Sequence, residues 1–409
     1  MSRPRFRRTP KLELLESREV LSGGGPSAQA QYMLELVNLT RTNPAAAAQR
    51  FTTNLNDETS ATLNFYNVNL DQVRQEIAST PAKPPLAWNS VLAQTATQQS
   101  QDQANMGEQT HIGADGATLS TRLDRAGYTN RTSAAENAFA YASSVDEAMQ
   151  AFLIDWGVPS KGHFNNLLQP TTSADQSYHD TGIGIVSTNN KGLGPQVITQ
   201  DFGRQNGEQA DLLGVVYNDS NNDNFYQPGE GIGNATIQAQ NMQTGQTASV
   251  SSWDAGGYQI PLDPGKYQVT AKVNGQVVGA QQVNIGGDNV EVDFNTKQPF
   301  TAPVVIPQVR TQAAVVPAAV TPPPPPPPAA PAPPQVQVQA PPVQAPVQTP
   351  PSVQAPSPPQ AQPQAQTIMT FSAPVVAPIA QLSNPATPAF NVSWITSWTS
   401  WNATTAQNS

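Results

Sequence analysis

Cysteine is absent from all 409 residues of the chain. This absence excludes disulfides, thiolate metal sites and a cysteine nucleophile, so any bound metal must be held by histidine, carboxylate or carbonyl groups. Histidine is also scarce, because the chain has only His111, His163 and His179. Imidazole chemistry is therefore limited to three positions.

Charge of either sign is sparse as well. Only 12% of the residues are charged, the formal net charge is -9, and the basic residues beyond position 20 form no cluster. A nucleic-acid partner is excluded, because its phosphates would require a basic patch or stripe. No run of about 20 apolar residues occurs, so a membrane-spanning helix is not expected.

Proline, in contrast, is abundant and uneven. Most of the 40 prolines lie beyond residue 300, where charged residues almost vanish. Such a segment cannot bury apolar surface, so we predict a disordered proline-rich tail over 299–409 with polyproline II character. Near its end, Trp394, Trp398 and Trp401 recur at helical spacing. Two interpretations stay open for this end: a docking or sorting signal, or an unstructured segment.

The N-terminal segment combines a basic stretch with a short leucine-rich and glutamate-rich stretch over 12–22. It resembles leaders found on large exported bacterial proteins, which predicts an export leader and linker over 1–27. The alternative is a frayed amphipathic helix that does not act as an export signal. The basic residues are Arg3, Arg5, Arg7, Arg8 and Lys11.

Hydrophobic periodicity divides the remaining chain into two domains. Over 28–205 helical patterns come first and short strands later, which favours an α+β sandwich. Over 208–298 short alternating segments are separated by turn clusters, which favours a small immunoglobulin-like β sandwich. The expected helices are 28–51 with an interruption at Asn43-Pro44, 90–106 with Ser90 as N-cap, and 145–155. The expected strands are 182–186, 196–202, 214–217, 235–239, 257–260, 267–273 and 290–294.

Two histidines stand in an ordered series of motifs within the first domain. The series is Gln109-Thr110-His111, Ala135-Glu136-Asn137, Asp155 and Gly162-His163, and the flanking text includes Pro85-Leu86-Ala87-Trp88-Asn89 and Gly182-Ile183-Gly184-Ile185. This order resembles the CAP (SCP-like) family of the bacterial type. The resemblance implies an α-β-α sandwich whose cleft contains His111, Glu136 and His163, with Asp155 as the fourth member and Glu147 as the fallback. Ala135, Phe152 and the short Asp155 depart from the family pattern.

Three kinds of function fit these residues. Two neutral imidazoles with one or two carboxylates can bind a divalent metal such as zinc or magnesium, or orient a small ligand. The same His111, Glu136, Asp155 and His163 are the candidate catalytic residues of a metal-assisted hydrolase, although the sequence has no Gly-x-Ser-x-Gly and no His-Glu-x-x-His. The third reading is a purely structural adhesin. His179 is predicted to be a solvated turn residue.

A second oxygen-rich motif lies in the β domain. Asp219, Asn221, Asp223 and Glu230 occupy positions 1, 3, 5 and 12 of an EF-hand-like loop, and Phe225 offers its carbonyl at position 7. This context resembles the calcium-binding B modules of bacterial surface adhesins, so we predict a calcium site. The alternative is a β-turn rich in Asp and Asn.

Together, the resemblances imply a secreted or cell-surface protein. Its partner would be a small molecule, a lipid or a cell-envelope component, and its oligomeric state is not readable from the sequence. The enzyme question stays open, with a binding role preferred over turnover.

Overall fold

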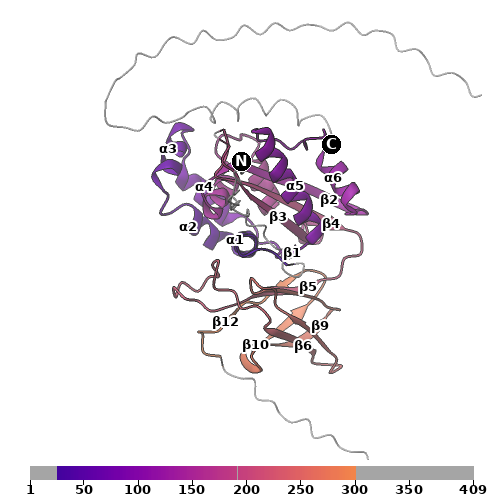
Figure 1. Cartoon of the computed structure of the whole chain (residues 1–409). Coiled ribbons are helices and arrows are strands. Elements are labelled where there is room, and N and C mark those ends of the chain that lie inside the picture. Colours follow the sequence, from indigo (N-terminus) through magenta and orange to yellow (C-terminus); the bar gives the residue numbers. More distant parts are fainter. Residues whose placement is uncertain (1–24, 191, 301–409) are drawn as a thin grey trace, which may run out of the picture. The chain divides into compact units, whose positions relative to one another are not determined.

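The computed structural model describes residues 25–190 and 192–300, which form the two domains drawn in colour in Figure 1. Most of the predicted leader and nearly all of the proline-rich tail, including its three tryptophans, lie outside the described residues. Within the described ranges, no helix is long and apolar enough to cross a membrane.

The first domain combines helices with a four-stranded sheet of order β1-β3-β4-β2, in which β1 pairs parallel to β3 and the other pairs are antiparallel. The helices are α1 (Ala28–Thr42), α2 (Pro44–Phe51), α3 (Asp57–Phe65), α4 (Leu70–Ser79), α5 (Ser90–Met106), α6 (Leu119–Ala126), α7 (Val145–Ile154) and α8 (Gly162–Leu168), with a 3-10 turn at Ala174–Gln176. The strands are β1 (Ala87–Trp88), β2 (Arg131–Ala142), β3 (Asp180–Ser187) and β4 (Gln196–Gln205).

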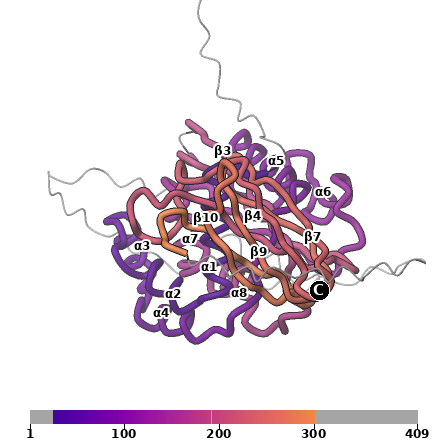
Figure 2. Tube along the Cα trace, turned by 90° about the horizontal axis from the view of Figure 1, so that it is seen from below, coloured from indigo at the N-terminus to yellow at the C-terminus, as the bar shows by residue number. Residues whose placement is uncertain are grey.

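The sheet lies between two helical layers. Helix α5 packs on β3 and β4 at very short range, while α1, α7 and α8 contact the sheet through a buried cluster that includes Ile183 and Phe202. In Figure 2 α2 and α4 lie together, away from α5 and α6. The α-β-α sandwich implied by the sequence resemblance is confirmed.

Local capping explains where the predicted helices begin and end. Asn43 ends α1, and its side-chain oxygen accepts a hydrogen bond from the Ala46 N–H at 3.1 Å, which starts α2 with Pro44 as its first residue. The helix over 90–106 forms as predicted, but its N-cap is Asn89 and not Ser90. The Asn89 oxygen accepts from the N–H groups of Val91 and Leu92 in the first turn.

Strand β2 and the helices α3, α4, α6 and α8 were not expected from the sequence. The β2 sequence, Arg-Thr-Ser-Ala-Ala-Glu-Asn-Ala-Phe-Ala-Tyr-Ala, is rich in small and polar residues and lacks the alternation that marks a half-buried strand. It forms a strand because both ends of its register pair with β4, from Arg131 opposite Gln205 to Ala142 opposite Gln196. Tertiary pairing therefore decided this element.

The second domain contains only strands, in two sheets, as predicted for an immunoglobulin-like fold. One sheet has the order β10-β9-β6-β7, and in the other β5 pairs with β8, β11 and β12. Tyr258, Val269 and Ile237 lie in the buried cluster between them. The strands are β5 (Asp211–Tyr217), β6 (Thr236–Asn241), β7 (Thr247–Ser251), β8 (Gly257–Pro261), β9 (Gly265–Val273), β10 (Gln276–Ile285), β11 (Val290–Glu291) and β12 (Phe294–Asn295).

The two domains are in contact across the short connection 206–210. The side-chain amide of Asn289 in the second domain donates to the carbonyls of Pro85 at 3.1 Å and His179 at 2.9 Å in the first. Nearby, the carboxyl groups of Glu35, Glu291 and Asp293 lie within 4.8 Å of one another. Burial raises the pKa of all three, that of Asp293 to about 6. Burial therefore favours the protonated form of Glu35 and Glu291 most strongly.

Candidate functional site

His111 lies in the loop that follows α5 and contacts Glu136 of β2. Its Nδ1 is 2.7 Å from the Glu136 Oε1. The loop is tied back to α5 through Thr110, whose carbonyl accepts from the Gln99 side chain at 2.6 Å and whose N–H donates to the Gln103 side chain at 3.2 Å. The position of His111 therefore depends on the position of α5.

Glu136 is the centre of a buried charge network. Arg122 of α6 forms an ion pair with its Oε2 and also donates to the His111 carbonyl at 2.9 Å. The β2–β4 register places Asp201 directly opposite Glu136, and Thr95 of α5 donates to Asp201 at 2.6 Å. Side chains opposite each other in a strand pair share one face of the sheet, so both acids face α5.

The two facing carboxyl groups cannot both be charged in this buried place. Burial, followed by the neighbouring Glu136 carboxyl, raises the pKa of Asp201 well above its usual range. Burial raises the pKa of Glu136 to about 7, against the lowering effects of Arg122 and of a hydrogen bond from Asp201. A protonated Asp201 that donates to an ionised Glu136 satisfies both groups, and the Glu136 charge is balanced by Arg122.

His111 is held in the neutral form. Burial, then the nearby His163 and Arg122, lower the pKa of His111 to about 3, although 24% of its side chain is exposed. A neutral imidazole is the form that binds a metal ion. Because the charge of His163 affects His111, the two rings lie within electrostatic range of each other.

His163 lies in the first turn of α8 and contacts Asp155. Its Nδ1 is 2.7 Å from the Asp155 Oδ1, while the Asp155 Oδ2 accepts the N–H groups of His163 at 2.9 Å and Phe164 at 3.1 Å. Asp155 has a left-handed backbone with φ of 56° where α7 ends, which directs its short side chain to the start of α8. One carboxylate thus caps the helix and orients the imidazole.

The fallback acid, Glu147, has a different role. Its carboxylate accepts the N–H of Ser143 at 2.7 Å and pairs with the Ser143 hydroxyl, while Ser144 accepts from the Glu147 N–H at 3.1 Å. This arrangement is a variant of the capping box at the start of α7, in which the glutamate bonds to the residue before the N-cap Ser144. Glu147 therefore stabilises the helix and does not contact either imidazole.

The structure brings the four expected cleft residues together as two pairs, His111 with Glu136 and His163 with Asp155. The four residues are not among the groups whose ligand atoms all lie within 4.8 Å of one another, and each carboxylate contacts the Nδ1 side of its ring. A metal ion would accordingly bind through Nε2 of each ring, with the acids orienting the rings. Sequence reasoning missed Arg122 and Asp201, whose roles follow from β2 and its register.

The expectation that His179 is a solvated turn residue is wrong. The residue is 4% exposed, and its Nδ1 is 3.1 Å from Asp180 Oδ1 and 3.6 Å from Glu208 Oε2. Its backbone extends the sheet, since its N–H donates to the Gly203 carbonyl and its own carbonyl accepts from Ala87. Sheet pairing and the second domain cover a segment whose local sequence indicates a turn.

The oxygen-rich loop of the second domain is closed by its own backbone. Asp219 accepts the N–H groups of Asp223 at 3.2 Å and Asn224 at 3.1 Å, and Asn224 has the left-handed φ of 60° expected at the glycine position. Glu230 accepts the N–H groups of Ser220 at 2.8 Å and Gln227 at 2.9 Å. The loop backbone fits the predicted shape, but both Glu230 oxygens already accept hydrogen bonds.

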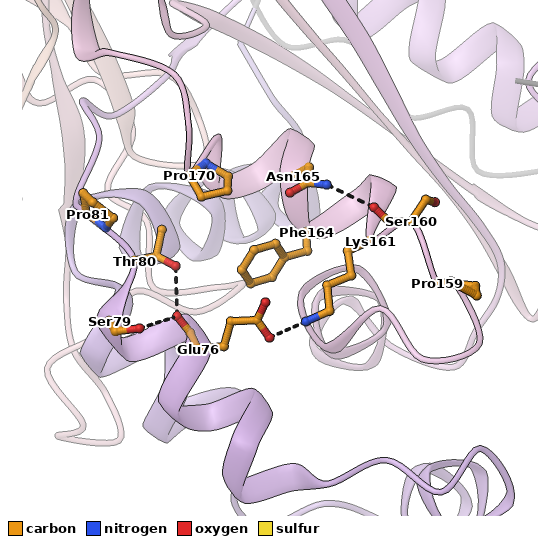
Figure 3. Close-up of a pocket in the computed structure, with 10 residues that line it drawn as sticks. All are labelled: Glu76, Ser79, Thr80, Pro81, Pro159, Ser160, Lys161, Phe164, Asn165 and Pro170. Carbon is orange, nitrogen blue, oxygen red and sulfur yellow. Dashed lines mark hydrogen bonds and ion pairs between the residues drawn. The ribbon is translucent and has the colours of Figure 1, made fainter. Parts of the chain in front are cut away.

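Two surface pockets lie between α4 and the segment leading into α8. The first, of about 380 Å³, contains Phe164 and is crossed by the ion pair of Glu76 and Lys161 (Figure 3). The second, of about 420 Å³, includes Asp155 and Trp156 in its lining. Neither pocket is lined by His111, Glu136 or His163. The second pocket nevertheless reaches Asp155, the carboxylate that contacts the His163 ring.

Comparison with known proteins agrees with this architecture. The cysteine-rich secretory protein family, CAP, matches residues 35–202, and the carboxypeptidase regulatory-like domain family matches residues 226–297. No curated protein matches. An extracellular SCP-domain protein from Bacillus anthracis is 25% identical, with 36% of this chain and 40% of that chain covered and a TM-score of 0.24. This chain thus matches less than half of that protein.

A second solved structure, an outer surface protein from Borrelia burgdorferi, is 14% identical, with 36% of this chain and 95% of that chain covered and a TM-score of 0.25. Sequence motifs, the α-β-α sandwich and the family match over 35–202 agree with one another. The chain therefore carries a CAP domain of the cysteine-rich secretory protein family, followed by a carboxypeptidase regulatory-like domain with an immunoglobulin-like fold.

Proposed function

We propose that the CAP domain binds a divalent metal ion, with zinc preferred, through Nε2 of His111 and of His163. The observation that carries this proposal is the matched pair of Nδ1–carboxylate contacts, each 2.7 Å long. A carboxylate on Nδ1 fixes the ring orientation, and Nε2 is the nitrogen that binds the ion in metal sites built on such pairs. Water or a small ligand would complete the coordination.

A binding role is preferred over hydrolysis because the candidate bases are poorly suited to proton transfer. With a pKa of about 3, His111 is a weak base at neutral pH. Burial raises the pKa of Glu136 to about 7, but its carboxylate is only 2% exposed and is held in an ion pair with Arg122. A general base works best when its pKa lies near the working pH and its carboxylate is accessible. The proposal therefore assigns orientation, not proton transfer, to Glu136 and Asp155.

Zinc titration of the chelator-treated full chain tests the cleft. His111→Gln is expected to remove one zinc equivalent, and Asp155→Asn is expected to weaken that site about 10- to 100-fold through loss of ring orientation. Isothermal titration calorimetry measures both. Asp146→Asn is the matched control, because Asp146 lies on α7 but bonds to Tyr32 and not to an imidazole. Unchanged zinc stoichiometry in His111→Gln contradicts the proposal.

We also propose that the loop over 219–230 binds calcium. Support comes from the oxygen ligands at the expected spacing and from the left-handed Asn224. Glu230 would have to exchange its hydrogen bonds to Ser220 and Gln227 for the ion. Calcium should raise the melting temperature of the full chain relative to chelator, and Asp219→Asn should abolish that rise. Identical melting curves at saturating calcium would exclude the site.

For the whole protein, we propose a secreted or cell-surface location in which the two domains are presented by the proline-rich segment. The match to a secretory protein family and the leader-like N-terminal sequence support this location. The proposed partner is a small molecule, a lipid or a cell-envelope component that contacts the CAP domain.

A further inference from the structure

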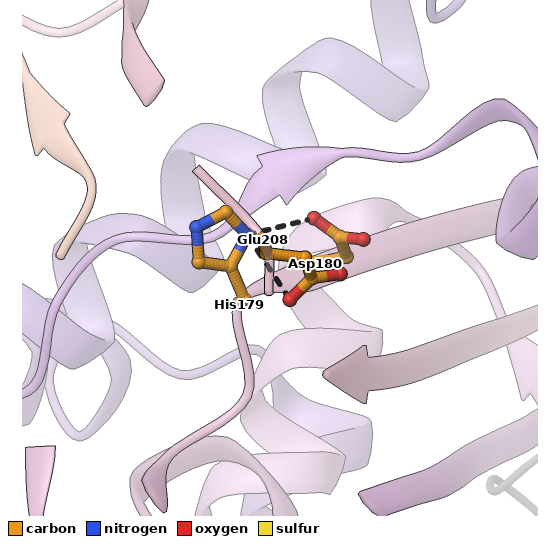
Figure 4. Close-up of side chains that lie close together, drawn as sticks. All are labelled: His179, Asp180 and Glu208. Carbon is orange, nitrogen blue, oxygen red and sulfur yellow. Dashed lines mark hydrogen bonds and ion pairs between the residues drawn. The ribbon is translucent and has the colours of Figure 1, made fainter. Parts of the chain in front are cut away.

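The third histidine belongs to a buried polar cluster that neither the cleft nor the calcium loop explains. His179 and Asp180 come from the start of β3, and Glu208 comes from the connection 206–210 between the two domains. Figure 4 shows the His179 Nδ1 facing both carboxylates. One ligand atom from each of the three residues lies within 4.8 Å of the others.

The cluster has an excess of buried negative groups. The side chains of His179, Asp180 and Glu208 are 5%, 9% and 14% exposed. Asp211, 8% exposed, adds a third carboxyl close enough to affect His179. Among the described residues no lysine or arginine forms an ion pair with these three acids. A buried carboxylate without a counter-charge is costly, so the cluster needs protons or a cation.

Hydrogen bonding leaves several of these atoms unsatisfied. Both Glu208 oxygens, the Asp211 Oδ1 and the His179 Nε2 are buried and make no hydrogen bond of normal geometry. The Gln205 N–H is near enough to Glu208 to lower its pKa, but burial and Asp180 outweigh it and raise that pKa to about 7. Buried polar atoms without partners indicate a ligand or water that completes the site.

The remaining oxygen of Asp180 is oriented by neutral donors. Its Oδ2 accepts from the Asn89 amide at 2.9 Å and from the Tyr128 hydroxyl at 3.2 Å, which directs Oδ1 toward His179. The Nδ1 to Oδ1 and Nδ1 to Oε2 distances are 3.1 Å and 3.6 Å. Ligands about 2.1 Å from a tetrahedral zinc ion lie about 3.4 Å apart. Both distances from His179 Nδ1 are therefore close to the ligand spacing of a zinc site, and the two carboxylate oxygens lie within 4.8 Å of each other.

We propose that His179 Nδ1, Asp180 Oδ1 and Glu208 Oε2 bind one zinc-like divalent cation that fastens the interdomain connection to the CAP sheet. One imidazole with two carboxylates favours zinc over the hard cations calcium and magnesium, which prefer oxygen alone. The ion neutralises the carboxylates and joins Glu208 of the connection to Asp180 of β3 and to His179, which directly precedes that strand. Its role is structural, and it is independent of the metal site proposed at His111 and His163.

Zinc stoichiometry of the full chain tests this site separately from the cleft. After chelator treatment, wild type is expected to bind two equivalents in calorimetry and in metal analysis. His111→Gln/His163→Gln should keep one equivalent, and Glu208→Gln should also keep one. The combined triple variant should bind none. Asp263→Asn is the matched control near the connection, because Asp263 accepts a hydrogen bond from Gln209 and not from the cluster. This variant should bind two equivalents of zinc.

The outcomes separate the two proposals. A wild type that binds one equivalent, lost in Glu208→Gln, supports the junction site and contradicts the cleft. One equivalent lost only in His111→Gln/His163→Gln overturns the junction site, as does an unchanged stoichiometry in Glu208→Gln.

Thermal unfolding provides a second readout that does not depend on stoichiometry. Without metal, Glu208→Gln should melt no lower than wild type, because it removes a buried carboxyl beside Asp180. Zinc should raise the melting temperature of His111→Gln/His163→Gln, because the ion binds the junction site only when the protein is folded. Zinc should leave the melting temperature of the triple variant unchanged. If zinc raised the melting temperatures of the double and triple variants equally, the junction site would be overturned.

Discussion

Glu136→Gln is expected to lower the free energy of unfolding by about 3–5 kcal/mol, because it leaves the Arg122 guanidinium without its counter-charge. Arg122 is 7% exposed, and its other described acceptors are the carbonyls of His111 and Ala117. Removing one partner of a buried ion pair costs more than the pair contributes, since the remaining charge stays desolvated. Urea-induced unfolding of the full chain measures the change.

Two further variants isolate the cause. Asp201→Asn places a neutral amide where we infer a protonated carboxyl, so its stability should stay within about 1 kcal/mol of wild type. Arg122→Met/Glu136→Met removes both charges and should recover most of the stability lost in Glu136→Gln. If Asp201→Asn is as damaging as Glu136→Gln, Asp201 is ionised and the charge network has been assigned wrongly.

The order of motifs along the sequence was enough to find both imidazole–acid pairs. The motifs predict that His111, Glu136, Asp155 and His163 share one site, and the structure pairs them as His111 with Glu136 and His163 with Asp155. The structure does not bring these four residues together as the ligands of one metal ion. A sequence motif identifies which groups are present, whereas the ring nitrogen that each acid contacts depends on backbone geometry such as the left-handed Asp155.

Long-range pairing explains what the sequence could not show. Arg122 lies on α6, a short helix that was not expected, and Asp201 is significant only because the β2–β4 register places it opposite Glu136. His179 follows a segment with turn-like composition, so its burial depends on pairing with Gly203 and Ala87 and on the second domain. Neither the local secondary-structure propensity nor the hydrophobic periodicity of the sequence predicts these contacts.

Helix α5 packs against the glycine pair of β3, Gly182 and Gly184, at its residues Ala93 and Ala96. A Cβ built on Gly182 would lie 1.9 Å from the backbone nitrogen of Ala93, and one on Gly184 would lie 2.3 Å from that of Thr97. The obstructing atoms are helix backbone, which cannot rotate away as a side chain can. Helix α5 therefore approaches the sheet closely only because these two positions lack side chains.

Gly182→Ala is accordingly expected to lower the free energy of unfolding by about 3 kcal/mol and to weaken zinc binding in the cleft. Ordinary contact begins at 3.4 Å, so α5 must move by about 1.5 Å from its 1.9 Å clash. That movement carries the His111 loop with it, because Gln99 and Gln103 of α5 hold Thr110. Urea unfolding and zinc calorimetry measure the two effects.

Gly286→Ala is the matched control, since a Cβ at Gly286 meets no atom within 4 Å, and its stability should change by less than about 0.5 kcal/mol. The two effects of Gly182→Ala need not coincide. If Gly182→Ala loses stability but keeps the wild-type zinc affinity, the His111 loop is held by β2 through Glu136 and not by α5. If Gly182→Ala loses both stability and zinc affinity, the spacing between α5 and the sheet determines the geometry of the metal site, although Gly182 lies at a distance from the imidazole that would bind the ion.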